Sequence, residues 1–130
     1  MGDLFARYVV RPEPIQHLLH HEMAAVAQQV GVAYRYMDAE MVAGADLVVH
    51  VRKVDGVPPG LPSFVDPHRH DVSHFYGLVG DLTVHLQLND EEGEVTGPAG
   101  IFIPPGVVHR LQLARGSGYL IVILRQARYE

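Results

Sequence analysis

The pattern of hydrophobic and polar residues divides the chain into an N-terminal helical part and a longer β-rich part. Between Pro14 and about Val30, apolar residues recur at steps of three and four, which predicts one face of an amphipathic α-helix. Gly31 suits the position just past the end of that helix. Glu22 falls inside the apolar face, where a carboxylate needs a partner. We expect a structural salt bridge there rather than a group facing the interior.

From residue 46 onward, short β-type runs alternate with segments rich in glycine, proline, asparagine and aspartate. The run at residues 81–88 alternates perfectly, with apolar side chains on one face and His85 and Gln87 on the other. This pattern predicts an all-β sandwich or barrel of antiparallel strands. We expect an N-terminal extension, residues 1–45, with the helix at about 14–30, followed by the β-barrel at 46–130. The predicted strands are 46–54, 65–70, 74–79, 81–88, 100–103, 108–113 and 119–124.

Length and composition restrict the class of protein. A chain of 130 residues with 48% hydrophobic residues is sufficient for one domain with one core. The net charge of -5 disfavours nucleic acid and anionic membranes as partners. The first residues lack the apolar core of a secretion signal and no apolar run is long enough to span a membrane, so we expect a cytoplasmic protein. The absence of cysteine leaves only nitrogen and oxygen ligands for a metal.

Four of the nine histidines lie at spacings that suit a metal site. His68 and His70 are two residues apart, so both side chains project from the same face of an extended strand. His74 has the same parity and can approach that face if the chain bends. His109 follows a Pro-Pro-Gly turn, which can bring its strand beside the first pair. The spacing therefore predicts one metal ion held by His68, His70, His74 and His109.

The two histidine segments resemble the two motifs of the cupin superfamily. The first motif is His68-x-His70 with a third ligand at residue 74 and a glycine at 80, and the second is Pro104-x-Gly106-x-x-His109. The resemblance covers about residues 46–124 and is specific because both motifs occur in order. It implies a cupin-type antiparallel β-barrel, or jelly roll, with the N-terminal helix packed outside and the metal inside.

One ligand departs from the common cupin pattern. Most metal cupins carry glutamate where this chain has His74, so the resemblance is to the smaller four-histidine group, which includes manganese cupins and zinc-dependent polyketide cyclases. Four neutral imidazoles leave a divalent ion its full charge, which favours an anionic oxygen donor as substrate. Zinc, nickel, manganese and iron all remain open, although the usual ligand triad of iron oxygenases is absent.

Further site residues follow from strand parity and from the cupin resemblance. His50 and Arg52 share one face of the strand at 46–54, which lines either the barrel interior or a solvent-exposed edge. If that face is the interior, Arg52 can bind an anionic group and His50 can act as acid or base. The catalytic candidates are His50, Tyr76 and His85. The substrate-binding candidates are Arg52, Gln87, Phe102, Gln112 and Tyr119.

Two classes of function remain open from the sequence. The first is a metal-dependent enzyme acting on a small molecule with an enolisable carbonyl or carboxylate, as a lyase, isomerase, cyclase or dioxygenase. The second is a non-catalytic module that binds a metal or a small ligand. We expect a homodimer by family analogy and because the apolar segment Leu4–Val10 can add a strand to a neighbouring subunit.

Overall fold

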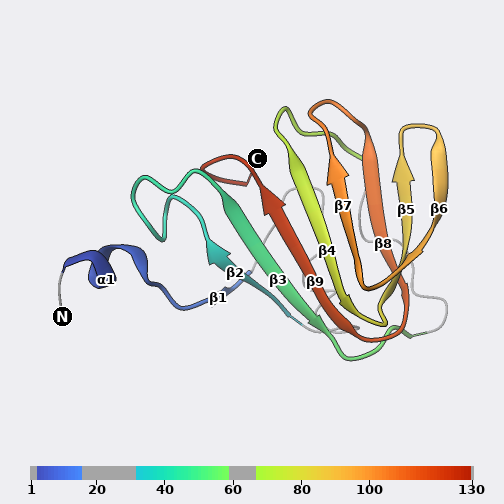
Figure 1. Ribbon diagram of the computed structural model, residues 1–130, viewed down its shortest axis with the longest axis horizontal. Coiled ribbons are helices and arrows are strands. Elements are labelled where there is room, and N and C mark those ends of the chain that lie inside the picture. The colour runs from blue at the N-terminus through green and yellow to red at the C-terminus, as the bar shows by residue number, and fades with distance from the viewer. Residues whose placement is uncertain (1–2, 16–31, 59–66, 130) are drawn as a thin grey trace.

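Two antiparallel sheets form the described part of the protein. The computed structural model describes residues 3–15, 32–58 and 67–129 (Figure 1). The six-stranded sheet has the order β1 (Glu13–Pro14), β2 (Ala33–Met37), β3 (Val48–Val54), β9 (Gly118–Leu124), β4 (His74–Gly80) and β7 (Ala99–Ile103). The three-stranded sheet has the order β6 (Glu91–Thr96), β5 (Thr83–Leu88) and β8 (His109–Arg115). The predicted all-β jelly roll is confirmed.

The hydrophobic core lies between the inner faces of the two sheets. The alternation predicted along β5 is confirmed, because Val84 and Leu86 point into the core and are buried. Leu82, just before β5, is fully buried beside them. Burying one such side chain contributes about 1.5–3 kcal/mol to stability. Strands of the opposite sheet complete the core with Tyr76, Leu78, Ile101, Ile103 and Leu120.

The register of the large sheet separates an apolar end from a histidine-bearing end. On one row across β3, β9 and β4, His50 lies opposite Val122, which lies opposite Tyr76. The next row toward the far end carries Arg52 and Leu120. At the upper end in Figure 1, β4 begins while β7 and β9 end, and the C-terminus lies near them. His74 thus lies at the upper end, whereas Arg52 lies further along the sheet, level with the core residues Leu120 and Leu78.

Three strands of the fold, β1, β2 and β6, were not predicted from the sequence. The strand β2 lies within the predicted N-terminal extension but pairs with β3 as part of the large sheet. Its tyrosines at 34 and 36 alternate with Arg35, and this alternation is typical of a β-strand. The strand β6 is acidic and mostly exposed, so it has no apolar alternation. Pairing with β5 fixes it, and the hairpin needs only Asn89 and Asp90 as its turn.

The N-terminal segment differs from the sequence-based prediction. Asp3–Tyr8 forms the short helix α1, so the prediction that Leu4–Val10 forms an added strand is wrong for these residues. Asp3 in the first turn and Arg7 in the last suit the helix dipole. Pro14 belongs to β1 rather than to a helix, and the remainder of the predicted helix, with Glu22, lies outside the described residues. In the part of the chain that is described, no helix has the length and apolarity to cross a membrane.

Two glycines with the same backbone conformation lie in strand connections that are packed differently, Gly44 between β2 and β3 and Gly116 between β8 and β9. Gly116 and Gly44 both have a φ of 89°, which favours glycine. A Cβ on Gly116 would collide with the backbone carbonyl of Asp81, whereas nothing lies within 4 Å of a Cβ on Gly44. We expect Gly44→Ala to lower the free energy of unfolding by about 1 kcal/mol and Gly116→Ala to lower it by about 2 kcal/mol more. Urea denaturation measures both, and equal losses would contradict the close approach.

Candidate metal centre

The backbones of the two histidine motifs are joined directly. His68 and His109 form an antiparallel bridge in which each backbone amide donates to the other residue's carbonyl, at 3.0 and 2.7 Å. The amide of Gly106 donates to the carbonyl of His70 at 2.8 Å, so the Pro-Pro-Gly turn is held against the first motif. Of the strand predicted at 65–70, the described residues show only the bridge at His68. These contacts bring His68, His70 and His109 to one place.

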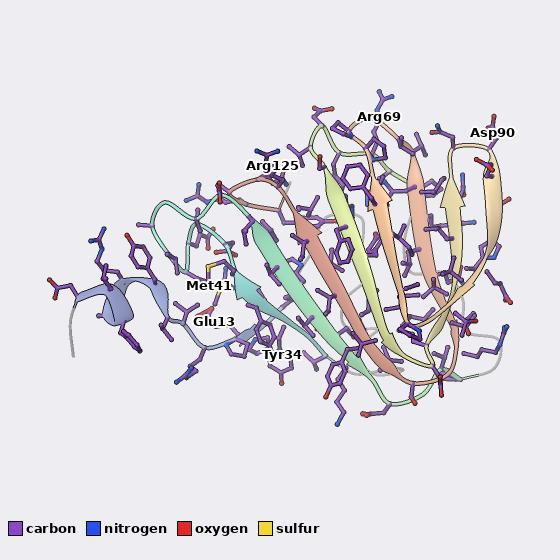
Figure 2. All side chains as sticks on the ribbon, viewed as in Figure 1. Glu13, Tyr34, Met41, Arg69, Asp90 and Arg125 are labelled. Atoms are coloured by element: carbon purple, nitrogen blue, oxygen red, sulfur yellow. The ribbon has the colours of Figure 1, made fainter. Side chains whose placement is uncertain are left out.

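Three imidazoles converge closely enough to hold one metal ion. One ring nitrogen from each of His68, His70 and His109 lies within 4.8 Å of the others, and all three residues are buried. Figure 2 shows the neighbouring Arg69 at the same end, and this residue is exposed, as expected for the residue between two inward-facing side chains. His74 begins β4 beside this group, with its ring centroid 5.3 Å from that of His70 and 4.9 Å from that of His109. Its role as a fourth ligand stays a prediction.

The hydrogen bonding of His109 fits a metal ligand. Its Nδ1 lies 3.0 Å from the carbonyl oxygen of Val107, which can only accept, so Nδ1 carries the proton. The Nε2 lone pair is therefore free for a metal, and this buried nitrogen has no hydrogen-bond partner among the described residues. Burial is the main cause that lowers the pKa of His109 to about 4, so the ring is neutral near pH 7. The donor set thus suits a divalent transition metal.

The face of β3 that carries His50 and Arg52 lines the interior of the barrel. His50 and Arg52 are both buried, at 6% and 8% exposure, on the face that also carries the buried Val48 and Val54. Burial lowers the pKa of His50 to about 4, with Asp38 opposing this shift. Burial also lowers the pKa of Arg52 to about 10, which leaves it cationic at neutral pH. The interior therefore holds a neutral imidazole and a cation on one strand.

Tyr76 also lies where the sequence placed it, inside the barrel. Its ring centroid is 4.3 Å from that of His74 and 6.3 Å from that of His109. Burial, followed by the proximity of Tyr129, raises the pKa of Tyr76 above its usual value. The phenol is therefore a neutral hydrogen-bonding group next to the histidines.

The other predicted site residues lie on outer faces, away from the histidines. His85 is opposite Gln112 on the outer face of the small sheet, and its Nε2 lies 3.2 Å from Glu92. Gln87 lies on the same outer face, where its side chain donates to the carbonyl of Asn89. In β5 and β8 the inward positions belong to the alternate, apolar residues, so the interpretation of these polar ones as pocket residues is corrected.

The aromatic candidates of the large sheet also lie on an outer face. Phe102 and Tyr119 are 62% and 43% exposed, on the face opposite the core. Their strands β7 and β9 place Ile101, Ile103 and Leu120 inward instead. The structure therefore does not bring Phe102 or Tyr119 to the histidines.

A residue that sequence reasoning missed lies in the site. The ring of Tyr129 stacks on that of His50 and meets the ring of His70 edge-on. Burial raises the pKa of Tyr129 to about 12. It follows the last strand, where no alternation indicates which way a side chain points, so the sequence carried no signal for it.

Comparisons with known proteins identify the fold. No family model matches the chain, and no curated protein sequence does. A solved structure of a protein from Planctomyces limnophilus is similar, with 19% identity, coverage of 89% of this chain and 83% of that chain, and a TM-score of 0.56. An RmlC-like cupin from Shewanella frigidimarina has 21% identity, coverage of 74% and 78%, and a TM-score of 0.52.

A third similar structure is an enzyme with known metal centres. Oxalate decarboxylase from Bacillus subtilis, described with Mn(II) centres, has 10% identity and a TM-score of 0.55, over 78% of this chain but only 27% of its own. This chain therefore corresponds to about a quarter of that enzyme. Together with the two-sheet architecture, these similarities show that the fold is of the cupin type. The resemblance found in the sequence is thus confirmed for the fold.

The metal site predicts a sharp contrast between two histidine variants. His109→Ala removes a fully buried candidate ligand, so we expect zinc content to fall from about one ion per chain to well below one half. His85→Ala changes an exposed histidine on the outer face and should leave the content unchanged. Elemental analysis after supplementation with zinc and gel filtration measures both. Equal zinc content in the two variants would exclude His109 as a ligand.

The neutral His50 predicts a pH dependence of stability. Its pKa in the folded protein, about 4, lies below the ordinary 6.5, so between these values the unfolded chain binds the extra proton. The free energy of unfolding must therefore fall as the pH drops from 6.5 to 4, by up to about 1.4 kcal/mol per pH unit for this group. Urea denaturation of metal-free protein should show a shallower slope for His50→Gln. An unchanged slope would mean that His50 is protonated in the fold.

Proposed function

We propose that this protein is a metal-dependent enzyme acting on a small anionic molecule with an enolisable carbonyl or a carboxylate. The observation that carries the proposal is the buried Arg52, which lies with His50 on the inner face of β3. A buried guanidinium is well suited to bind a carboxylate or enolate in two hydrogen bonds. In our proposal His74 joins His68, His70 and His109 as the fourth metal ligand.

The proposed mechanism assigns separate tasks to the inner side chains. A divalent ion held by His68, His70, His74 and His109 would supply Lewis acidity for a substrate oxygen. Arg52 binds and orients the anionic group of the substrate. His50 receives or returns the proton, because an anion bound nearby raises its low pKa toward the range of an effective base. Tyr76, a neutral phenol, donates a hydrogen bond to the substrate oxygen.

Several finer assignments belong to this proposal. A redox-neutral lyase, isomerase or cyclase reaction agrees with neutral imidazole ligands, while the Mn(II) centres of the decarboxylase keep manganese and a dioxygenase reaction open. We propose zinc, nickel, manganese or iron as the ion, a cytoplasmic location and a homodimer. The exposed Leu4 and Phe5 of α1 are apolar surface that a second subunit can cover.

The alternative is a cupin that binds a metal or small ligand without turnover. The buried His109 Nε2 favours metal binding equally in this case. The two functions differ in whether protons of a bound compound exchange. We therefore suggest incubating the zinc-loaded protein in D2O with pyruvate, oxaloacetate or acetylacetone. Proton NMR then measures how fast the protons of each compound exchange with deuterium.

Exchange of substrate protons for deuterium that is faster than without protein would support the enzymatic function. This exchange should be lost when the metal is removed and in His74→Ala. Binding of the same compounds without exchange, in protein loaded with each of the four metals, would support the binding module. Oxygen uptake during turnover would assign the dioxygenase branch, and its absence would remove that branch.

Arg52 gives a direct prediction for ligand binding. Replacing it in Arg52→Gln removes a charge-assisted pair, so the dissociation constant of oxalate for the zinc-loaded protein should rise by at least about tenfold. Arg52→Lys keeps the positive charge but not the planar guanidinium, so its dissociation constant for oxalate should lie between those of the parent protein and Arg52→Gln. Calorimetry measures both. Arg115→Gln, at an exposed ion pair with Glu94, is the control and should bind like the parent protein. A normal constant for Arg52→Gln would remove Arg52 from the binding site.

A further inference from the structure

The chain after β9 folds back toward the histidine end of the barrel. The backbone amide of Arg125 donates to the carbonyl of Ser73 at 3.1 Å, and the amide of Ala39 donates to the carbonyl of Ala127 at 2.8 Å. Figure 2 shows Arg125 at the same end of the sheets as Arg69, and Figure 1 marks the C-terminus near that end. The segment is thus attached both to the loop that precedes β4 and to the turn that follows β2.

These attachments place Tyr129 between two elements of the site. Its ring centroid lies 5.7 Å from that of His50, with the two planes 21° apart, which is a stacked arrangement. It lies 5.5 Å from the ring of His70 at 77°, which is an edge-on contact. His50 belongs to β3, and His70 belongs to the segment before β4. The ring therefore spans the space between the large sheet and the first histidine motif.

We propose that Tyr129 is a positioning residue that holds His50 and His70 in place and controls access from solvent to the interior they line. The metal part of this inference rests on the proposed function, while the access part does not. The predicted ligands His68, His70 and His74 are each less than 10% exposed, so a ligand must displace something to reach them. Tyr129 covers one of them and the neighbouring His50 together.

The attachment of this segment is weak enough to open without disturbing the sheets. Outside Tyr129 itself, its contacts include the two backbone hydrogen bonds and a long ion pair, 3.7 Å from Arg128 Nε to Glu40 Oε1, between exposed side chains. Exposed pairs of this kind contribute little to stability. Local opening of such a segment requires far less free energy than unfolding. Tyr129 is thus able to leave and return while the core stays intact.

The access part is tested by chemical modification of metal-free protein with diethyl pyrocarbonate, read by peptide mass spectrometry. His85, partly exposed on the outer face of the small sheet, is an internal reference in every sample. In Tyr129→Ala the modification rates of His50 and His70, relative to His85, should rise by about tenfold, as expected for the loss of two aromatic contacts. Tyr129→Phe keeps both ring contacts and should stay within about twofold of the parent protein.

A matched control removes a tyrosine elsewhere. Tyr36, 45% exposed on β2, has no ring contact with the histidines among the described residues. Tyr36→Ala should leave the relative rates unchanged. Unchanged rates in Tyr129→Ala, or an equal rise in Tyr36→Ala, would overturn the proposal. Urea denaturation verifies folding, and Tyr129→Leu replaces Tyr129→Ala if the latter does not fold.

The positioning part is tested with the protein loaded with Co(II). Tyr129→Ala should lose the ion to excess chelator about tenfold faster and show a shifted visible spectrum, whereas Tyr129→Phe should restore both. Parent-like spectrum and chelation rate in Tyr129→Ala would refute a positioning role. If the parent protein fails to bind any metal, the proposed function is wrong, and the modification experiment still decides the access role.

Discussion

The backbone bridge between His68 and His109 is the interaction on which the site depends. A pair of mutual hydrogen bonds fixes the distance and direction of two chain segments that lie far apart in sequence. With His70 tied to Gly106 through a third bond, the first motif cannot shift along β8 without breaking all three. Because shifting a strand by one residue turns its side chains to the opposite face, these bonds also determine that the imidazoles point inward.

The same strands provide both rigidity and chemistry. The strand β4 carries Leu78 into the hydrophobic core and His74 and Tyr76 into the histidine end, within one alternating pattern. The strand β3 likewise places Val54 in the core and His50 toward the site. Side chains on such strands are held by packing along the whole sheet, which favours precise positioning. The segment that carries Tyr129 is different, because it follows the last strand and its backbone is bonded to the loop residues Ser73 and Ala39.

The sequence predicted the fold and the histidine cluster but placed several outer residues inside. Spacing and parity are reliable for His68, His70 and His109 because turns and alternation locate them. Parity alone did not determine which face of β3 points inward. The pairing of β3 with β9 determines this. The alternation along β5 had already indicated the outer face for Gln87, and the pocket position that the cupin resemblance suggested for it was wrong. Tyr129 depends on contacts between distant segments, which alternation does not encode.

The neutrality of the imidazoles explains how such a site can exist inside a barrel. A buried carboxylate would lose its hydration at a cost of several kcal/mol unless a cation were bound. A neutral imidazole loses much less, and burial keeps the pKa of His109 near 4, so the barrel can fold before the metal is bound. At neutral pH such a ligand needs to release no proton when a metal binds. In the proposed four-histidine centre, histidine at position 74 avoids the desolvation cost of a carboxylate and leaves the ion its full charge for an anionic ligand.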